Sequence, residues 1–162
     1  MRRPEEFEWL PHALEALHLA AVAGWTAVVV TNQAGVGRGV HTQADLDLVH
    51  RRMSEQAAAA GGAIAAVYAC PHTPEDRCAC RKPQPGLLLA AAADLHLDLA
   101  SSWLIGDSEV DLAAAACVGV RRVLVRTGRG LITEADRPGL PPDAVCSDVL
   151  AAVRRIGPCP RA

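Results

Sequence analysis

The chain has 162 residues, a length typical of one domain with a substantial hydrophobic core. Its formal net charge is −2, from 16 basic and 18 acidic side chains, which excludes the strong basic field of a nucleic-acid or anionic-membrane binder. Hydrophobic residues make up 51% of the chain but aromatic ones only 3%, so the core must be built from Ala, Val and Leu. No apolar run approaches a membrane span and the first residues lack the apolar stretch of a signal peptide, so we expect a cytoplasmic protein.

Helices and strands are predicted to alternate along the chain. The run TAVVVTN is β-branched and does not alternate with polar residues, as in a parallel strand covered on both faces. The alternation of helices with strands predicts an α/β fold with a doubly wound, Rossmann-like parallel sheet. In such a fold, ligands bind at the carboxyl ends of the strands. The predicted helices span 12–23, 42–60, 86–97, 109–119 and 148–156, the predicted strands 26–32, 63–69, 102–107, 121–128 and 144–146, and 128–143 is predicted to be a long loop.

One loop, CPHTPEDRCACRKP, gathers four potential metal ligands within eleven residues. Two pairs of N or S donors on a short loop can close on one tetrahedral ion, so we predict a structural zinc site. The alternatives are unrelated thiols or a disulfide pair. A segment with so little apolar surface needs the metal to hold its shape, and with it the basic pair that follows. The predicted zinc ligands are Cys70, His72, Cys78 and Cys80, and the basic pair is Arg81 and Lys82.

The other three cysteines are scattered along the chain. We expect Cys117, Cys146 and Cys159 to be small buried or tail residues, the usual role of a free cysteine.

Two groups of residues are candidates for binding a phosphate. Thr31 and Asn32 end a predicted strand and can direct a hydroxyl, an amide and backbone N–H groups at an oxyanion, although such residues are also common in plain turns. Lys82 can neutralise a phosphoryl group and Arg81 offers a forked pair of donors to a second anion. The alternative for this basic pair is a solvated charge that balances the thiolates.

The motif GDSEVD contains two carboxylates one helical turn apart. Asp107 lies at the end of a predicted strand and Asp111 follows it on a helix, so both can face one crevice. Oxygen donors in this position suit Mg²⁺, which takes few protein ligands and relies on substrate phosphate for others. The alternative is that Asp107 caps the helix and Asp111 is a surface carboxylate.

These motifs, in this order, resemble those of one family. VTNQAGVGRG, CPHTPEDRCACRKPQPG, IGDSEVD and LVRTG are similar to the zinc-loop branch of the haloacid-dehalogenase-type phosphatases, and within it to the heptose bisphosphate and histidinol phosphatases. The resemblance implies that Thr31 and Asn32 bind the transferring phosphoryl group, and that Lys82 stabilises the charge on the nucleophile and phosphate. It further implies that Arg81 contacts substrate and that Asp107 holds Mg²⁺ with support from Asp111.

The resemblance lacks one essential part. In that family the nucleophile and the acid/base are two aspartates in a D-x-D-G-T motif that ends the first strand, and the region matched here begins after it. Asp45 and Asp47 lie inside a predicted helix, and Asp94 and Asp98 flank the end of another, so neither pair can substitute. We therefore predict that the 162-residue chain itself is inactive.

The missing motif also has a structural consequence. The first strand of this fold belongs between the strands that end at Thr31 and at Asp107, and its absence leaves a gap of about 10 Å between them. We therefore expect residues 1–162 to be a single, amino-terminally truncated phosphatase domain whose first central strand is missing.

The resemblance implies a Mg²⁺-dependent phosphatase of a small phosphorylated metabolite, acting through an aspartyl phosphate in the full-length form. A heptose 1,7-bisphosphate is the expected substrate and histidinol phosphate the alternative. The rival of another class is a non-catalytic, zinc-stabilised phosphate-binding module, favoured by the absent D-x-D motif. We expect a monomer with a small-molecule substrate, and neither nucleic acid nor membrane as a partner.

Overall fold

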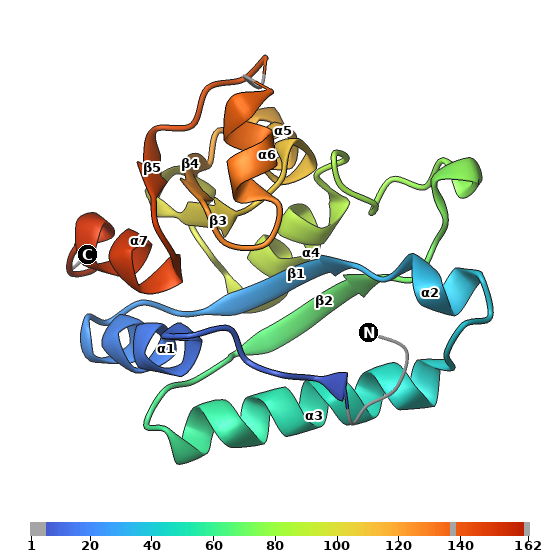
Figure 1. The fold of residues 1–162 in the computed structure, drawn as a ribbon, viewed down its shortest axis with the longest axis horizontal. Coiled ribbons are helices and arrows are strands. Elements are labelled where there is room, and N and C mark those ends of the chain that lie inside the picture. Colours follow the sequence, from blue (N-terminus) through green and yellow to red (C-terminus); the bar gives the residue numbers. More distant parts are fainter. Residues whose placement is uncertain (1–5, 137–138, 161–162) are drawn as a thin grey trace. The chain divides into compact units, whose positions relative to one another are not determined.

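The computed structural model describes residues 6–136 and 139–160 (Figure 1). Its contacts divide the chain into two compact units, with boundaries between Arg77 and Cys78 and between Arg155 and Ile156. No helix in these residues is long and apolar enough to cross a membrane.

The first unit contains a pair of parallel strands accompanied by helices. Strands β1 and β2 are in register from Val28 opposite Ala66 to Asn32 opposite Cys70, so their carboxyl ends lie side by side. Helix α3 runs alongside this pair (Figure 1). The elements are α1 (Ala13–Val22), β1 (Val28–Asn32), α2 (Ala34–Gly37), α3 (Gln43–Ala59), β2 (Ala66–Cys70) and the 3-10 turn η2 (Pro74–Asp76).

Helix α3 forms much of the core of this unit. Thr42 caps it: its hydroxyl accepts a hydrogen bond from the Asp45 backbone N–H, while the Asp45 carboxylate accepts one from the Thr42 N–H. This reciprocal arrangement satisfies two amides that a helix start otherwise leaves open. Three or four residues separate successive buried positions, which gives one apolar stripe. Its members are Leu46, Val49, Met53 and Ala57.

The second unit is built on three parallel strands. β4 lies between β3 and β5, pairing from Trp103 opposite Arg121 on one side and from Val123 opposite Ala144 on the other. Helix α5 packs against β3 and β4, and α6 against β4. The elements are α4 (Gly86–Leu95), η3 (Leu99–Ser101), β3 (Trp103–Gly106), α5 (Glu109–Cys117), β4 (Arg121–Val125), α6 (Gly130–Ala135), β5 (Ala144–Cys146) and α7 (Val149–Ile156).

The predicted α/β class and parallel strands are confirmed, and every predicted helix and strand is present. The described strands form two ladders, however, and those that end at Asn32 and Gly106 belong to different ones. The expectation that a first central strand is missing from between these two stays a prediction. Strand β1 is only half-buried along its length, rather than covered on both faces, because in the described residues it belongs to a ladder of two strands.

Two further predictions about secondary structure need correction. Residues 128–143 were predicted to be a loop but include α6, whose Glu134 accepts two hydrogen bonds from Arg126 at 2.7 and 2.8 Å. The glycine-rich turn after β1 contains the single helical turn α2. Both helices are too short to show an apolar period, so their stability comes from tertiary contacts that the sequence pattern does not reveal.

The three remaining cysteines have different environments. Cys146 is buried on β5, as predicted, and Cys159 is half-buried in the terminal segment, where its N–H donates to Ala23. Cys117 is exposed, so the expectation of burial is wrong for this residue. It is the last residue of α5 and lies outside the buried stripe of that helix.

We predict that Leu112→Ala destabilises the protein by about 2–5 kcal/mol, because Leu112 is fully buried and the deletion leaves a cavity. Leu131→Ala is the matched control, since Leu131 is 62% exposed and its loss should change the free energy of unfolding by less than about 0.5 kcal/mol. Urea denaturation of both variants measures the difference. Equal effects would contradict the assignment of the core.

Candidate active site

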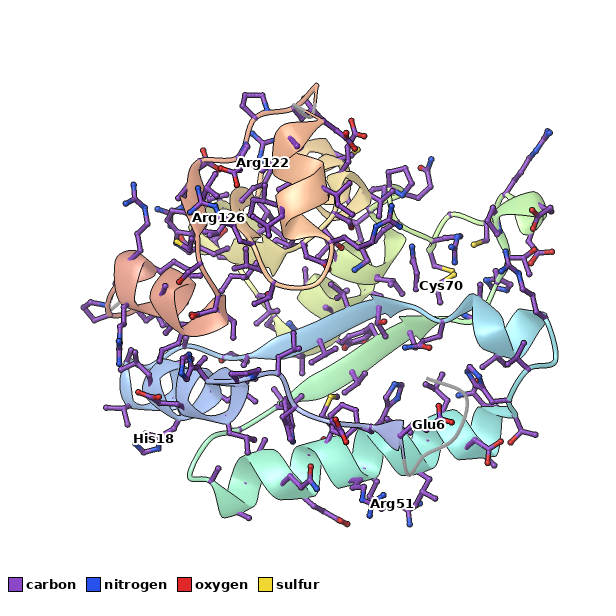
Figure 2. The ribbon with its side chains drawn as sticks, viewed as in Figure 1. Glu6, His18, Arg51, Cys70, Arg122 and Arg126 are labelled. Atoms are coloured by element: carbon purple, nitrogen blue, oxygen red, sulfur yellow. The ribbon has the colours of Figure 1, made fainter. Side chains whose placement is uncertain are left out.

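The four predicted metal ligands lie together. The ligand atoms of Cys70, His72, Cys78 and Cys80 are all within 4.8 Å of one another. Figure 2 shows Cys70 at the carboxyl end of β2. The Cys70 Sγ to His72 Nδ1 distance is 3.5 Å and the Cys80 Sγ to Cys78 Sγ distance is 3.4 Å. A tetrahedral site with bonds of zinc length has ligand separations of about 3.5–3.8 Å, so these residues could hold one metal ion. None of the six cysteines forms a disulfide in this structure.

The segment between the two pairs of candidate ligands contains a short 3-10 turn. Thr73 starts the 3-10 turn η2 with a capping box, in which the Asp76 carboxylate accepts from the Thr73 N–H at 2.7 Å. Hydrogen bonds from the Thr73 backbone and hydroxyl lower the pKa of Asp76 below its ordinary value. The capping box therefore shapes the intervening residues, and the donor pairs remain at the two ends of the turn.

The end of β1 is hydrogen-bonded to the start of this loop. The Gln33 N–H donates to the Cys70 carbonyl at 2.7 Å, and the Gly37 N–H donates to the Pro71 carbonyl at 3.0 Å. The Gln33 side-chain amide donates to the Thr31 hydroxyl at 3.2 Å. Thr31 and Asn32 thus lie at a strand end that is hydrogen-bonded to the loop of residues 70–83, called the metal loop below, rather than in an isolated turn.

In the second unit, Lys82 and Asp111 form a nearly buried ion pair. The Lys82 Nζ to Asp111 Oδ1 distance is 2.6 Å, and the two side chains are 10% and 9% exposed. The other carboxylate oxygen, Oδ2, accepts from the Ser108 hydroxyl at 2.5 Å and from the Ser108 N–H at 3.2 Å. A side chain at Gly106 would collide with this carboxylate, because its Cβ would lie 2.5 Å from that of Asp111. Asp111 therefore pairs with Lys82 through one oxygen and takes part in the cap of α5 through the other.

Asp107 is fixed by a turn that follows β4. Its Oδ2 accepts from the Arg129 N–H at 2.8 Å, and its backbone carbonyl accepts from the Thr133 hydroxyl at 2.8 Å. Gly128 has φ +59° and faces the Asp107 carboxylate, so this position requires a glycine both for its conformation and for its lack of a side chain. Among the described residues, Oδ1 of Asp107 makes no hydrogen bond, which leaves one oxygen available to a cation.

These contacts overturn the alternative reading of GDSEVD. Ser108, not Asp107, is the N-cap of α5, and Asp111 is 6% exposed rather than a surface carboxylate. The alternative of a solvated basic pair is also wrong for Lys82, because its ammonium is paired and nearly buried.

The structure therefore joins three of the predicted groups locally. The four metal ligands cluster, Lys82 meets Asp111, and the Thr31–Asn32 end of β1 is bonded to the metal loop. Sequence reasoning did not find the parts played by Gln33, Ser108 and Thr133. Ser108 could have been found, since a serine three residues before an acidic residue is a capping signature. Gln33 and Thr133 act through contacts that no local pattern encodes.

The site residues coincide with a region that matches known proteins. The HAD-hydrolase-like family matches residues 79–152. The D-glycero-beta-D-manno-heptose-1,7-bisphosphate 7-phosphatase of Pseudomonas putida is 40% identical over 151 residues, which cover 93% of this chain and 85% of that protein. The enzyme of the same name from Pseudomonas aeruginosa is 43% identical over 148 residues, or 90% of this chain and 82% of that protein. The chain belongs to the haloacid-dehalogenase-like phosphatase family.

A solved structure of a phosphatase from this family supports the assignment. The D,D-heptose 1,7-bisphosphate phosphatase of B. bronchiseptica, in complex with magnesium and phosphate, has a TM-score of 0.90 and 41% identity. The alignment covers 96% of this chain and 87% of that one. The predicted resemblance to this phosphatase family is therefore confirmed.

We predict that Asp111→Asn lowers the free energy of unfolding by about 3–5 kcal/mol, because it removes the negative charge that lies 2.6 Å from the nearly buried Lys82 ammonium. Glu134→Gln is the matched control: it breaks the exposed Arg126–Glu134 pair and should have little effect. Urea denaturation compares the two. A cost for Asp111→Asn that persists when Lys82 is replaced by Met would contradict the argument, since the pair would then not be its source.

Proposed function

We propose that this protein is a Mg²⁺-dependent phosphatase that removes a phosphate from a heptose 1,7-bisphosphate. The observation that carries the proposal is its similarity, at 40–43% identity over at least 90% of the chain, to enzymes named for this reaction. The paired Lys82 supports it, because a phosphoryl group needs a fixed positive charge that water does not screen. We further propose a location in the cytoplasm, where thiols stay reduced and able to bind a metal.

Each site residue has a proposed task. Thr31 and Asn32 bind the phosphoryl group at the end of β1, and Arg81 binds a second anionic group of the substrate. Lys82, oriented by Asp111, stabilises charge that develops on the nucleophile and the phosphate. Asp107 supplies the free oxygen Oδ1 to Mg²⁺, with Asp111 acting in support through Lys82 rather than through the metal, since both of its oxygens are already engaged.

The metal loop is proposed to bind zinc through Cys70, His72, Cys78 and Cys80. Three thiolates and one imidazole form a donor set that suits Zn²⁺, and their ligand atoms all lie within 4.8 Å of one another, close enough to surround one ion after small shifts. Bound zinc supplies folding energy to the loop, which lies immediately before Arg81 and Lys82.

One observation keeps a second candidate open. The single Asp-x-Asp of the sequence, Asp45 to Asp47, lies within α3, and Asp94 and Asp98 lie in α4 and before η3, so neither pair ends a strand. The aspartate nucleophile of the family is thus unassigned in these 162 residues. A phosphate-binding module that retains the site without turnover is the function this observation favours for the chain by itself.

We expect the chain to bind one equivalent of Zn²⁺, and Cys78→Ser to weaken binding by roughly two orders of magnitude or more, because one of four thiolate or imidazole donors is lost. Cys117→Ser is the matched control, since Cys117 is exposed and outside the cluster. Competition with a colorimetric chelator measures both affinities. A chain that takes up no zinc, or that loses it equally in both variants, would refute this site.

We expect phosphate binding in the presence of Mg²⁺ to be lost in Asp107→Asn, because an amide cannot supply the charged oxygen that Mg²⁺ prefers. Asp136→Asn is the control; this exposed residue follows α6 and carries the same charge. Phosphorus NMR titration of each variant with inorganic phosphate measures the change.

The accompanying assay is release of phosphate from heptose 1,7-bisphosphate. The 162-residue chain should show no turnover if the unassigned aspartate is required. Turnover that disappears in Asp107→Asn would exclude the binding-module candidate and would require a nucleophile among the residues of this chain. Failure to bind phosphate with Mg²⁺ would overturn the proposed function itself.

A further inference from the structure

We propose that Gln33 is a positioning residue that directs the proton of the Thr31 hydroxyl toward the bound phosphate. The inference deepens the proposed function and rests on it, since it concerns how Thr31 recognises a phosphoryl group. It is carried by the hydrogen bonds that hold Gln33 and by the donor and acceptor properties of a hydroxyl.

The first step is the geometry of the strand end. Residues two apart on a strand project to the same face, so Gln33, which follows the last residue of β1, shares the face of Thr31. The Gln33 amide Nε2 donates to Thr31 Oγ1 at 3.2 Å.

The second step is that the Gln33 backbone is held on both sides. Its N–H donates to the carbonyl of Cys70 at 2.7 Å, and its own carbonyl accepts from the Val36 N–H at 3.1 Å. Cys70 is completely buried. The backbone from which the Gln33 amide extends is therefore held in place beside Thr31.

The third step is the chemistry of the hydroxyl. A threonine hydroxyl has one proton to donate and two lone pairs to accept with, and an amide NH₂ can only donate. Gln33 therefore occupies a lone pair and leaves the proton directed elsewhere. Within residues 6–136 and 139–160, Thr31 Oγ1 makes no other hydrogen bond. A phosphoryl oxygen only accepts, so the hydroxyl is held in the orientation that such a ligand requires.

The contact also explains why this position needs an amide rather than a carboxylate. A glutamate of similar size would accept the Thr31 proton, which would turn the lone pairs of the hydroxyl toward the anion. The substrate would then meet an acceptor and a nearby negative charge instead of a donor.

The test is a double-mutant cycle on phosphate binding by the zinc-loaded chain with Mg²⁺, using inorganic phosphate as the probe and phosphorus NMR as the readout. The variants are Thr31→Val, Gln33→Leu and the two combined. Thr31→Val should weaken binding about tenfold or more, the usual loss for a hydrogen bond to a charged group. Gln33→Leu should weaken it about threefold to tenfold when Thr31 is present, and have no effect in the Thr31→Val background.

Two further variants separate positioning from a structural role. Gln33→Glu should weaken phosphate binding more than Gln33→Leu, because it reverses the hydrogen bond and adds charge. Gln43→Leu is the matched control, since its amide bonds the exposed Asp47 on α3. Zinc stoichiometry is measured for every variant and should stay at one equivalent.

The outcomes are distinguishable. If the unsubstituted chain binds no phosphate, or if Thr31→Val has no effect, the proposed role of Thr31 fails and the inference with it. If Thr31→Val weakens binding but Gln33→Leu has no effect, or the same effect in both backgrounds, the inference is overturned and the proposed function stands.

Discussion

Lys82 and Asp111 form an ion pair that is almost removed from solvent. Removing an ammonium and a carboxylate from water costs several kcal/mol for each ion, and this cost is recovered only where geometry and additional hydrogen bonds are good. Asp111 meets that condition because one oxygen contacts Lys82 and the other caps α5 through Ser108. Gly106 makes room for it at the end of β3. The helix start, the strand end and the lysine are therefore all in contact with this one carboxylate.

Asp107, like Asp111, makes several contacts at once. One of its oxygens and its backbone carbonyl accept hydrogen bonds from the turn after β4 and from α6, so these segments are held by the residue that is proposed to bind Mg²⁺. A carboxylate fixed in this way loses little conformational freedom when a metal binds, which favours binding. The glycine at position 128 follows from this arrangement, because a side chain there would occupy the position of the carboxylate.

The sequence predicted those parts of the molecule whose signals are local. The cap at Thr42, the ligand spacing from Cys70 to Cys80 and the strand ends at Asn32 and Gly106 are each encoded within a few residues. The sequence did not predict α6 or the exposure of Cys117. Helix α6 spans only six residues and depends on Arg126 and Asp107, which lie outside its own sequence. Contacts of this kind are decided by the tertiary fold, and periodicity contains no information about them.

The backbone hydrogen bonds between the segment after β1 and the metal loop indicate a second structural role for that loop. Sequence reasoning gave the loop one purpose, to hold Arg81 and Lys82. The structure adds that the carbonyls of Cys70 and Pro71 accept the N–H groups of Gln33 and Gly37, so the loop also anchors the turn after Thr31. Coupling free energies are reciprocal. If metal binding stabilises the ordered turn, the ordered turn therefore raises the affinity for the metal by the same free energy. If this loop binds zinc as proposed, the metal would also support phosphate recognition, since it would hold the residue that is proposed to orient the Thr31 hydroxyl.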